Sequence, residues 1–184
     1  MRVITGKYRG RALKGPTHSG LRPTADRVKE ALFNILGARI IDADLLDLFA
    51  GTGSIGIEAL SRGANSVVFA DANRLSIKLL QENLKILSVD EKVRVCHTTA
   101  AQCIQILARE RAGFDLIFLD PPFEEGLLPD TMAGISHNRL LREDGILIVE
   151  HPAKLTVTGA GFTAFLTRNY GDIGLSFFHQ DTQD

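Results

Sequence analysis

The segment DLFAGTGSIG, Asp47 to Gly56, joins an apolar run to a helix-like run. Gly51, Gly53 and Gly56 match the pattern GxGxxG, and Asp71 ends the next apolar run. In α/β proteins such a loop lets the backbone approach a ligand at the start of a helix, while the acid binds ribose hydroxyls. The segment therefore predicts a site for a nucleoside-type ligand, although a tight turn without a ligand is the alternative.

Apolar runs and helix-like runs alternate on both sides of this loop. We expect strands at 45–49, 66–71, 92–97, 114–120 and 145–150, with helices near 54–62, 74–88, 100–111 and 130–141. Runs such as LLDLF, SVVFAD and DLIFLD are apolar on both faces, as in parallel strands covered by helices on each side. Residues 162–180 form two β-like runs that meet at a turn-forming cluster, Asn169 to Asp172. The pattern predicts a doubly wound α/β domain that ends in an antiparallel hairpin.

Length and composition limit the class of protein. A chain of 184 residues that is 45% hydrophobic is expected to form one globular domain with a small appendage. Its apolar runs fall short of the roughly 18 residues that a membrane span needs, and no secretion leader is recognisable. We expect a cytoplasmic protein without a membrane partner. Cys96 and Cys103 lack metal-site spacing and are predicted to be buried thiols.

Charge is distributed unevenly along the chain. Residues 1–39 carry nine Lys and Arg against two acids, a formal charge of +7, whereas the remaining residues carry 12 basic and 20 acidic side chains. Residues 2–15 suggest a short hairpin that displays Arg9 and Arg11, and a helix is expected from Thr24 to Gly37. We predict that residues 1–39 are a basic appendage that seeks phosphates, joined to a domain at 40–184; a merely solvated surface is the alternative.

The run FDLIFLDPPF, Phe114 to Phe123, ends a buried strand in an acid and two prolines. Ligands of open α/β sheets bind beyond the carboxyl ends of strands, so Asp120 is expected near the glycine loop. Pro121 and Pro122 have no N–H and leave carbonyls free to accept hydrogen bonds. A carboxylate and a carbonyl suit an exocyclic amine, and Phe123 offers a ring on which a base can stack. A proline-rich turn without this role is the alternative reading.

Several segments resemble a known family. DLFAGTGSIGIEALSRGA, FADAN and FLDPPF are similar to class I S-adenosylmethionine-dependent methyltransferases that modify amino groups. RVITGKYRGRALKGP, GLRPTADRVKEALFNIL and NYGDIGLSFF extend the resemblance, over nearly the whole chain, to the RsmD-type bacterial small-subunit rRNA guanine-N2 methyltransferases. The resemblance implies a seven-stranded, mostly parallel sheet whose last strand is inserted antiparallel.

The resemblance also implies a set of functional residues. Its cofactor, S-adenosylmethionine, is assigned to Asp47, Phe49, Gly51, Thr52, Gly53, Gly56, Asp71, Ala72, Thr99, Ala100 and Asp120. The catalytic residues are Asp120, Pro121, Pro122 and Phe123, and the RNA-binding residues are Arg9, Arg11, Arg22 and Arg27. The implied partner is 16S rRNA in an assembled or partly assembled 30S subunit. We expect a monomer without a metal site.

Other functions remain open at this stage. A methyltransferase acting on amino groups of DNA or of another RNA would use the same acid and prolines, although it commonly carries an additional target-recognition domain. A dinucleotide oxidoreductase shares the glycine loop, but the chain lacks a second domain and a Tyr-x-x-x-Lys pair. A non-catalytic RNA-binding assembly factor would explain the basic segment and would leave both loops unexplained.

Overall fold

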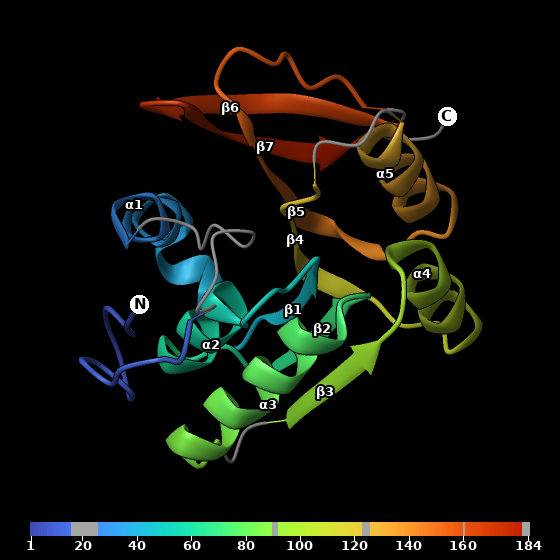
Figure 1. Cartoon of the computed structure of the whole chain (residues 1–184). Coiled ribbons are helices and arrows are strands. Elements are labelled where there is room, and N and C mark those ends of the chain that lie inside the picture. Colours follow the sequence, from blue (N-terminus) through green and yellow to red (C-terminus); the bar gives the residue numbers. More distant parts are fainter. Residues whose placement is uncertain (16–25, 90–91, 123–125, 160, 182–184) are drawn as a thin grey trace.

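The computed structural model describes residues 1–15, 26–89, 92–122, 126–159 and 161–181 (Figure 1). Its centre is a seven-stranded sheet of order β3-β2-β1-β4-β5-β7-β6. The strands are β1 Asp44–Leu48, β2 Ser66–Asp71, β3 Lys92–His97, β4 Phe114–Leu119, β5 Leu141–Pro152, β6 Phe162–Tyr170 and β7 Ile173–Gln180. The first five are parallel, and β7 lies antiparallel between β5 and β6. The predicted doubly wound sheet and its C-terminal antiparallel hairpin are confirmed.

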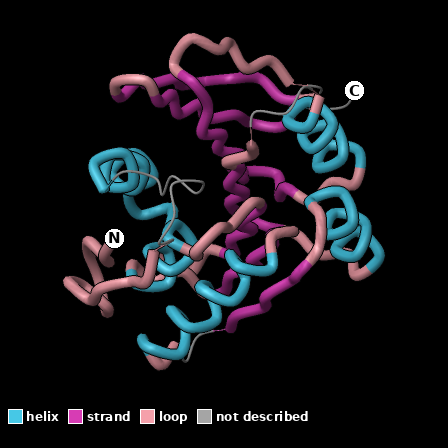
Figure 2. Tube along the Cα trace, viewed as in Figure 1, coloured by secondary structure: helices cyan, strands magenta, loops and turns pink. Residues whose placement is uncertain are grey.

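Helices cover both sides of this sheet (Figure 2). They are α1 Asp26–Leu36, the 3-10 helix η1 Gly37–Ile40, α2 Ser54–Ser61, α3 Arg74–Leu87, α4 Ala100–Arg109 and α5 Leu127–His137. Helices α1, α2 and α3 share one hydrophobic cluster with the sheet, and α4 and α5 share a second cluster on the opposite face. Side chains alternate between the faces of a strand, so Leu45 joins the first cluster and Leu46 the second. No helix in the described ranges has the length and apolar character to cross a bilayer.

The predicted element boundaries differ from the structure mainly around α5. This helix begins at Leu127 and includes Pro129, which the first turn of a helix tolerates because its N–H groups have no partner within the helix. The helix ends at His137 rather than at residue 141, and β5 begins at Leu141 rather than at residue 145. The predicted helix cap Thr24 lies outside the described residues.

The N-terminal segment packs against the main domain. An isolated antiparallel bridge joins Arg2 to Ala12, in agreement with the predicted hairpin. Val3, Tyr8 and Leu13 are buried in the same cluster as α1 and α2. The segment therefore contributes to the core on one face of the sheet.

Buried polar side chains also hold this segment. The buried Glu58 carboxylate accepts the backbone amides of Ile4 and Thr5 at 2.7 and 3.0 Å. The fully buried Asn83 donates to the carbonyls of Lys14 and Thr52, both at 3.0 Å. Since Thr52 belongs to the glycine loop, Asn83 links the N-terminal segment to that loop.

Candidate active site

The glycine loop between β1 and α2 is packed closely against its neighbours. A Cβ added at Gly53 would lie 2.3 Å from Leu80 Cδ1, and one at Gly56 would lie 2.2 Å from Phe69 Cε1. A Cβ at Gly51, where φ is +55°, would meet open space. No other residue could therefore replace Gly53 or Gly56 without displacing core atoms, whereas the loop backbone is open at Gly51.

Asp71, at the end of β2, binds this loop directly. Its carboxylate accepts the Gly51 amide at 2.8 Å and the Asn73 amide at 2.7 Å. The side chain is half-buried and retains acceptor capacity for a ligand, since a carboxylate offers about four lone-pair sites. The neighbouring Ala72 is exposed. An acid in this position beside an open backbone fits the ribose of a nucleoside ligand.

Asp47 lies beneath the loop and is 1% exposed. Its carboxylate accepts the Gly56 amide at 3.1 Å. Burial raises the pKa of Asp47 to about 7, and the Gly56 hydrogen bond opposes this rise only in part. Asp47 therefore supports the loop through its backbone, and it adds negative charge to the site when ionised. Of the other loop residues, Phe49 is half-buried with φ 67° and Thr52 is buried.

The end of β3 completes the cofactor side of the site. His97 donates from Nε2 to the Ala72 carbonyl at 3.2 Å, which ties the ends of β2 and β3 together. Thr99 caps α4, since its hydroxyl oxygen accepts the Gln102 amide at 3.2 Å. Thr99 is exposed and its hydroxyl hydrogen remains available to a ligand, whereas the side chain of Ala100 is buried.

Asp120 follows β4 and is half-buried. Its pKa is raised to about 8, mainly by burial and in addition by the nearby negative charges of Glu150 and Asp47. Asp120 thus has two other acids near it, Asp47 from β1 and Glu150 from β5. Because opposite charge relieves such repulsion, this cluster favours a cationic ligand. Pro121 is buried beside it.

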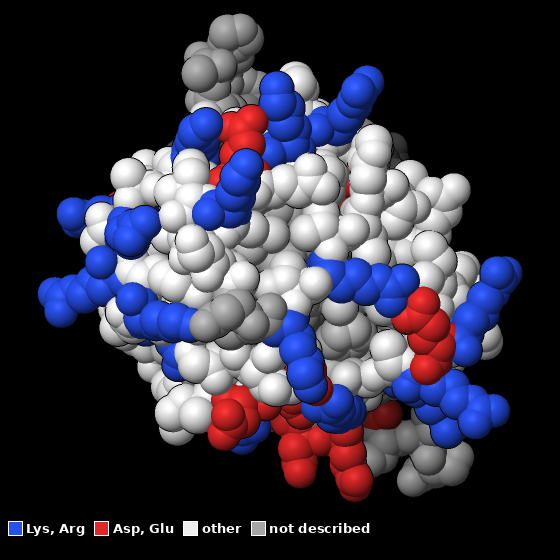
Figure 3. Space-filling model, turned by 90° about the horizontal axis from the view of Figure 1, so that it is seen from below, with Lys and Arg blue, Asp and Glu red and all other residues white. Residues whose placement is uncertain are grey.

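The remaining predicted residues lie on the surface or outside the described ranges. Pro122, Arg9, Arg11 and Arg27 are exposed, whereas Phe123 and Arg22 are outside the described residues. Arg11 donates to the Ile86 carbonyl at 3.1 Å, so it also helps to hold the N-terminal segment on α3. On the face shown in Figure 3, Lys and Arg side chains project around most of the outline, and the largest group of Asp and Glu side chains lies at the lower margin.

Sequence reasoning missed two residues of this site, Glu150 and Asn83. Glu150 ends the apolar run ILIVE in β5, and an acid after a buried strand is the same signal that identified Asp71 and Asp120. Asn83 carried no such signal, because it lies within an ordinary helical pattern. Its role depends on contacts with residues distant in the sequence.

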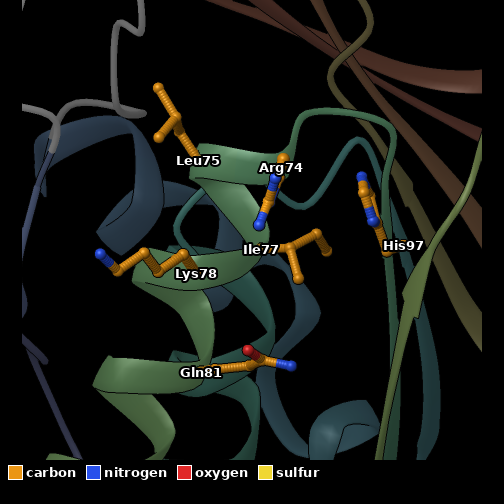
Figure 4. A pocket seen from close by; sticks show the side chains of 6 residues that line it. All are labelled: Arg74, Leu75, Ile77, Lys78, Gln81 and His97. Atoms are coloured by element: carbon orange, nitrogen blue, oxygen red, sulfur yellow. The ribbon is translucent and has the colours of Figure 1, made fainter.

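A separate pocket of about 610 Å³ lies between α3 and the end of β3 (Figure 4). It is lined by Arg74, Leu75, Ile77, Lys78, Gln81 and His97. This lining includes none of the glycine-loop residues, and the pocket adjoins the candidate site through His97 and its bond to Ala72.

A parallel sheet that ends in an inserted antiparallel strand, with a ligand loop after its first strand, is the architecture of the class I methyltransferases. Within that class, the chain belongs to the family described as Conserved hypothetical protein 95, whose model matches residues 1–179.

Comparison with individual proteins agrees with this family. The chain is 37% identical over 180 residues to YlbH of Bacillus subtilis, covering 97% of this chain and 98% of YlbH. It is 35% identical to the ribosomal RNA small subunit methyltransferase D of Escherichia coli, covering 100% of this chain and 91% of that protein. The solved structure of yhhF from Escherichia coli matches with a TM-score of 0.86 at 34% identity, over 100% of this chain and 99% of that one.

Proposed function

We propose that this protein transfers a methyl group from S-adenosylmethionine to the exocyclic N2 amine of a guanine in 16S rRNA. The family and the name of the Escherichia coli relative support methylation of small-subunit rRNA. One observation carries the proposal from the structure: the Asp120 carboxylate, followed by two prolines, lies beside the acids at the ends of β1 and β5. This is where a ligand on the glycine loop and an acceptor base would meet.

The glycine loop and the strand ends hold the cofactor, which supplies the methyl group. The backbone around Gly51 receives its amino-acid part, and Asp71 accepts hydrogen bonds from its ribose hydroxyls. Ala72 and the hydroxyl of Thr99 border its adenine. Its sulfonium charge suits the acid cluster, because a cation nearby lowers the cost of keeping three carboxylates together.

Asp120 and Pro121 orient the acceptor amine. The lone pair of the guanine N2 is delocalised into the ring, and hydrogen bonds from its two N–H groups to the Asp120 carboxylate and the Pro121 carbonyl direct it toward the methyl group. Phe123 stacks on the base. As the new N–C bond forms, the methyl–sulfur bond of the cofactor would break and leave a neutral thioether; the N–H becomes acidic, and Asp120 accepts the proton. A pKa of about 8 before ligands bind suits an acceptor working near neutral pH.

Basic residues near the start of the chain position the RNA. Arg9, Arg11, Arg22 and Arg27, all within residues 1–39, contact phosphates, while the target base leaves its stack to reach Asp120. The substrate is an assembled or partly assembled 30S subunit, and the enzyme acts on it as a monomer in the cytoplasm.

The test separates cofactor binding from methyl transfer. Asp120→Ala is expected to abolish transfer while calorimetry still detects binding of S-adenosylmethionine, whereas Asp71→Ala weakens that binding. Glu143→Ala is the matched control, because Glu143 is exposed at the opposite end of β5. Near wild-type turnover by Asp120→Ala would remove Asp120 from the mechanism.

A further inference from the structure

The C-terminal hairpin begins at the catalytic edge of the sheet. The antiparallel register pairs Glu150 with Leu175 and Pro152 with Ile173. The Ala153 amide also donates to the Asp172 carbonyl at 2.9 Å, which fixes the turn between β6 and β7 beside the end of β5. Since Glu150 belongs to the acid cluster, the start of β7 is a neighbour of the acceptor site.

One cross-strand row connects that cluster to the edge strand β6. Leu175 pairs with Glu150 on one side and with Arg168 on the other. Residues paired across neighbouring strands point to the same face, and Leu175 belongs to the cluster on the α1 face. Two strand spacings of about 4.8 Å place the Arg168 backbone roughly 10 Å from that of Glu150. Arg168 therefore lies on the α1 face, a short distance from the acceptor site.

Arg168 is available to a partner. Its guanidinium is exposed and donates to the carbonyl of the adjacent Thr167 at 3.1 Å. Within the part of the chain that the structure describes, no carboxylate lies within ion-pair distance of Arg168 or of Lys154. Lys154 is exposed in the connection after β5, and the exposed Asp172 is the nearby acid in the hairpin turn. The exposed guanidinium of Arg168 can bind a phosphate through two parallel hydrogen bonds.

We propose that Arg168, assisted by Lys154, binds an RNA phosphate next to the target nucleotide. This inference rests on the proposed function and adds residues that hold the substrate. A base drawn out of its stack needs its strand held on both sides of the pocket. The N-terminal segment lies beside α2, whereas the β6–β7 hairpin forms one edge of the sheet, beyond α1 (Figure 1), so Arg168 holds the strand on the side away from Arg9 and Arg11.

The experiment compares Arg168→Ala, Arg168→Lys and Lys154→Ala with Arg109→Ala. Arg109 is exposed at the end of α4, which covers the opposite face of the sheet, and is the matched loss of one positive charge. Binding of a 16S rRNA transcript and of unmethylated 30S subunits is measured over a range of salt concentrations. Calorimetry with S-adenosylmethionine and thermal melting are performed on each variant.

We expect Arg168→Ala to weaken RNA binding and to reduce the slope of log affinity against log salt by about 0.7–0.9. We expect Arg168→Lys to retain the slope of the wild type. In both Arg168 variants the affinity for S-adenosylmethionine should stay within about twofold of the wild type, and the melting temperature should be unchanged because the side chain is exposed. An Arg168→Ala slope equal to that of the wild type or of Arg109→Ala would overturn the inference. Failure of the wild type to methylate any RNA would instead overturn the proposed function.

Discussion

The Lys29 ammonium lies 3.6 Å from the Glu58 carboxylate, and neither side chain is exposed. Lys29 also donates to the Arg2 carbonyl at 2.8 Å and to the Ser54 hydroxyl at 3.1 Å. Burial lowers the pKa of Lys29, and the charge of Glu58 opposes that effect. Because Ser54 begins α2 directly after the glycine loop, this pair anchors the basic segment on the helix that carries the ligand loop.

Breaking this pair is expected to destabilise the whole domain. Glu58→Gln leaves a buried ammonium without its counter-charge and weakens the acceptors of two backbone amides, at a cost of about 3–5 kcal/mol in the free energy of unfolding. Chemical denaturation measures the loss. Glu82→Gln is the control, because Glu82 also binds the N-terminal segment, through Lys14, at the surface. Equal losses for the two variants would show that the buried pair has no special role.

Two glycines of the same loop are expected to respond differently to alanine. Gly56→Ala drives a methyl group into the ring of Phe69 and should lower the melting temperature strongly. Gly51→Ala has open space around its Cβ, so it should fold with a smaller loss and bind S-adenosylmethionine more weakly. Melting curves with and without the cofactor distinguish these effects. Unchanged cofactor affinity in Gly51→Ala would contradict the assignment of the loop.

The charge on Asp120 should make stability depend on pH. Its folded pKa of about 8 lies above 3.8, the ordinary value for an aspartate in an unfolded chain, so the folded protein binds more protons than the unfolded chain between these values. This contribution to stability is complete below the lower pKa and is lost as pH rises through the higher one. Asp120→Asn should therefore gain stability relative to the wild type on going from about pH 5 to about pH 9. Chemical denaturation measures the difference in the free energy of unfolding between Asp120→Asn and the wild type. A difference that stays constant over this pH range would refute the raised pKa of Asp120.

The same carboxyl should control the pH dependence of catalysis. Asp120 must be ionised to accept a hydrogen bond and then the proton from the amine, so kcat/KM is expected to rise with pH to a plateau, with a midpoint near the pKa of about 8 in the free enzyme. Glu150→Gln removes a neighbouring negative charge and should move the midpoint to lower pH. Glu143→Gln, distant from the cluster, should leave it in place. A midpoint that stays unchanged in Glu150→Gln would show that Asp120 does not govern the profile.

The sheet and the ends of its strands could be predicted because both depend on local patterns. Apolar runs identified every parallel strand, and the acids Asp71 and Asp120 were expected at its catalytic edge. The start of α5 was missed because a proline in a first turn resembles a break between elements. The burial of Lys29 was also missed. A lysine counted toward a basic surface becomes a core residue only through contacts with Glu58 and the Arg2 carbonyl, which lie far away in the sequence.

The most direct test of the central claim is transfer of labelled methyl groups from S-adenosylmethionine to unmethylated small-subunit particles, naked 16S rRNA and duplex DNA, followed by nucleoside analysis. The account predicts that the label is recovered as N2-methylguanosine from rRNA, most efficiently from the particles. Label on adenine, on cytosine or on DNA would contradict the proposed acceptor, and so would the absence of label from every substrate while the cofactor is bound.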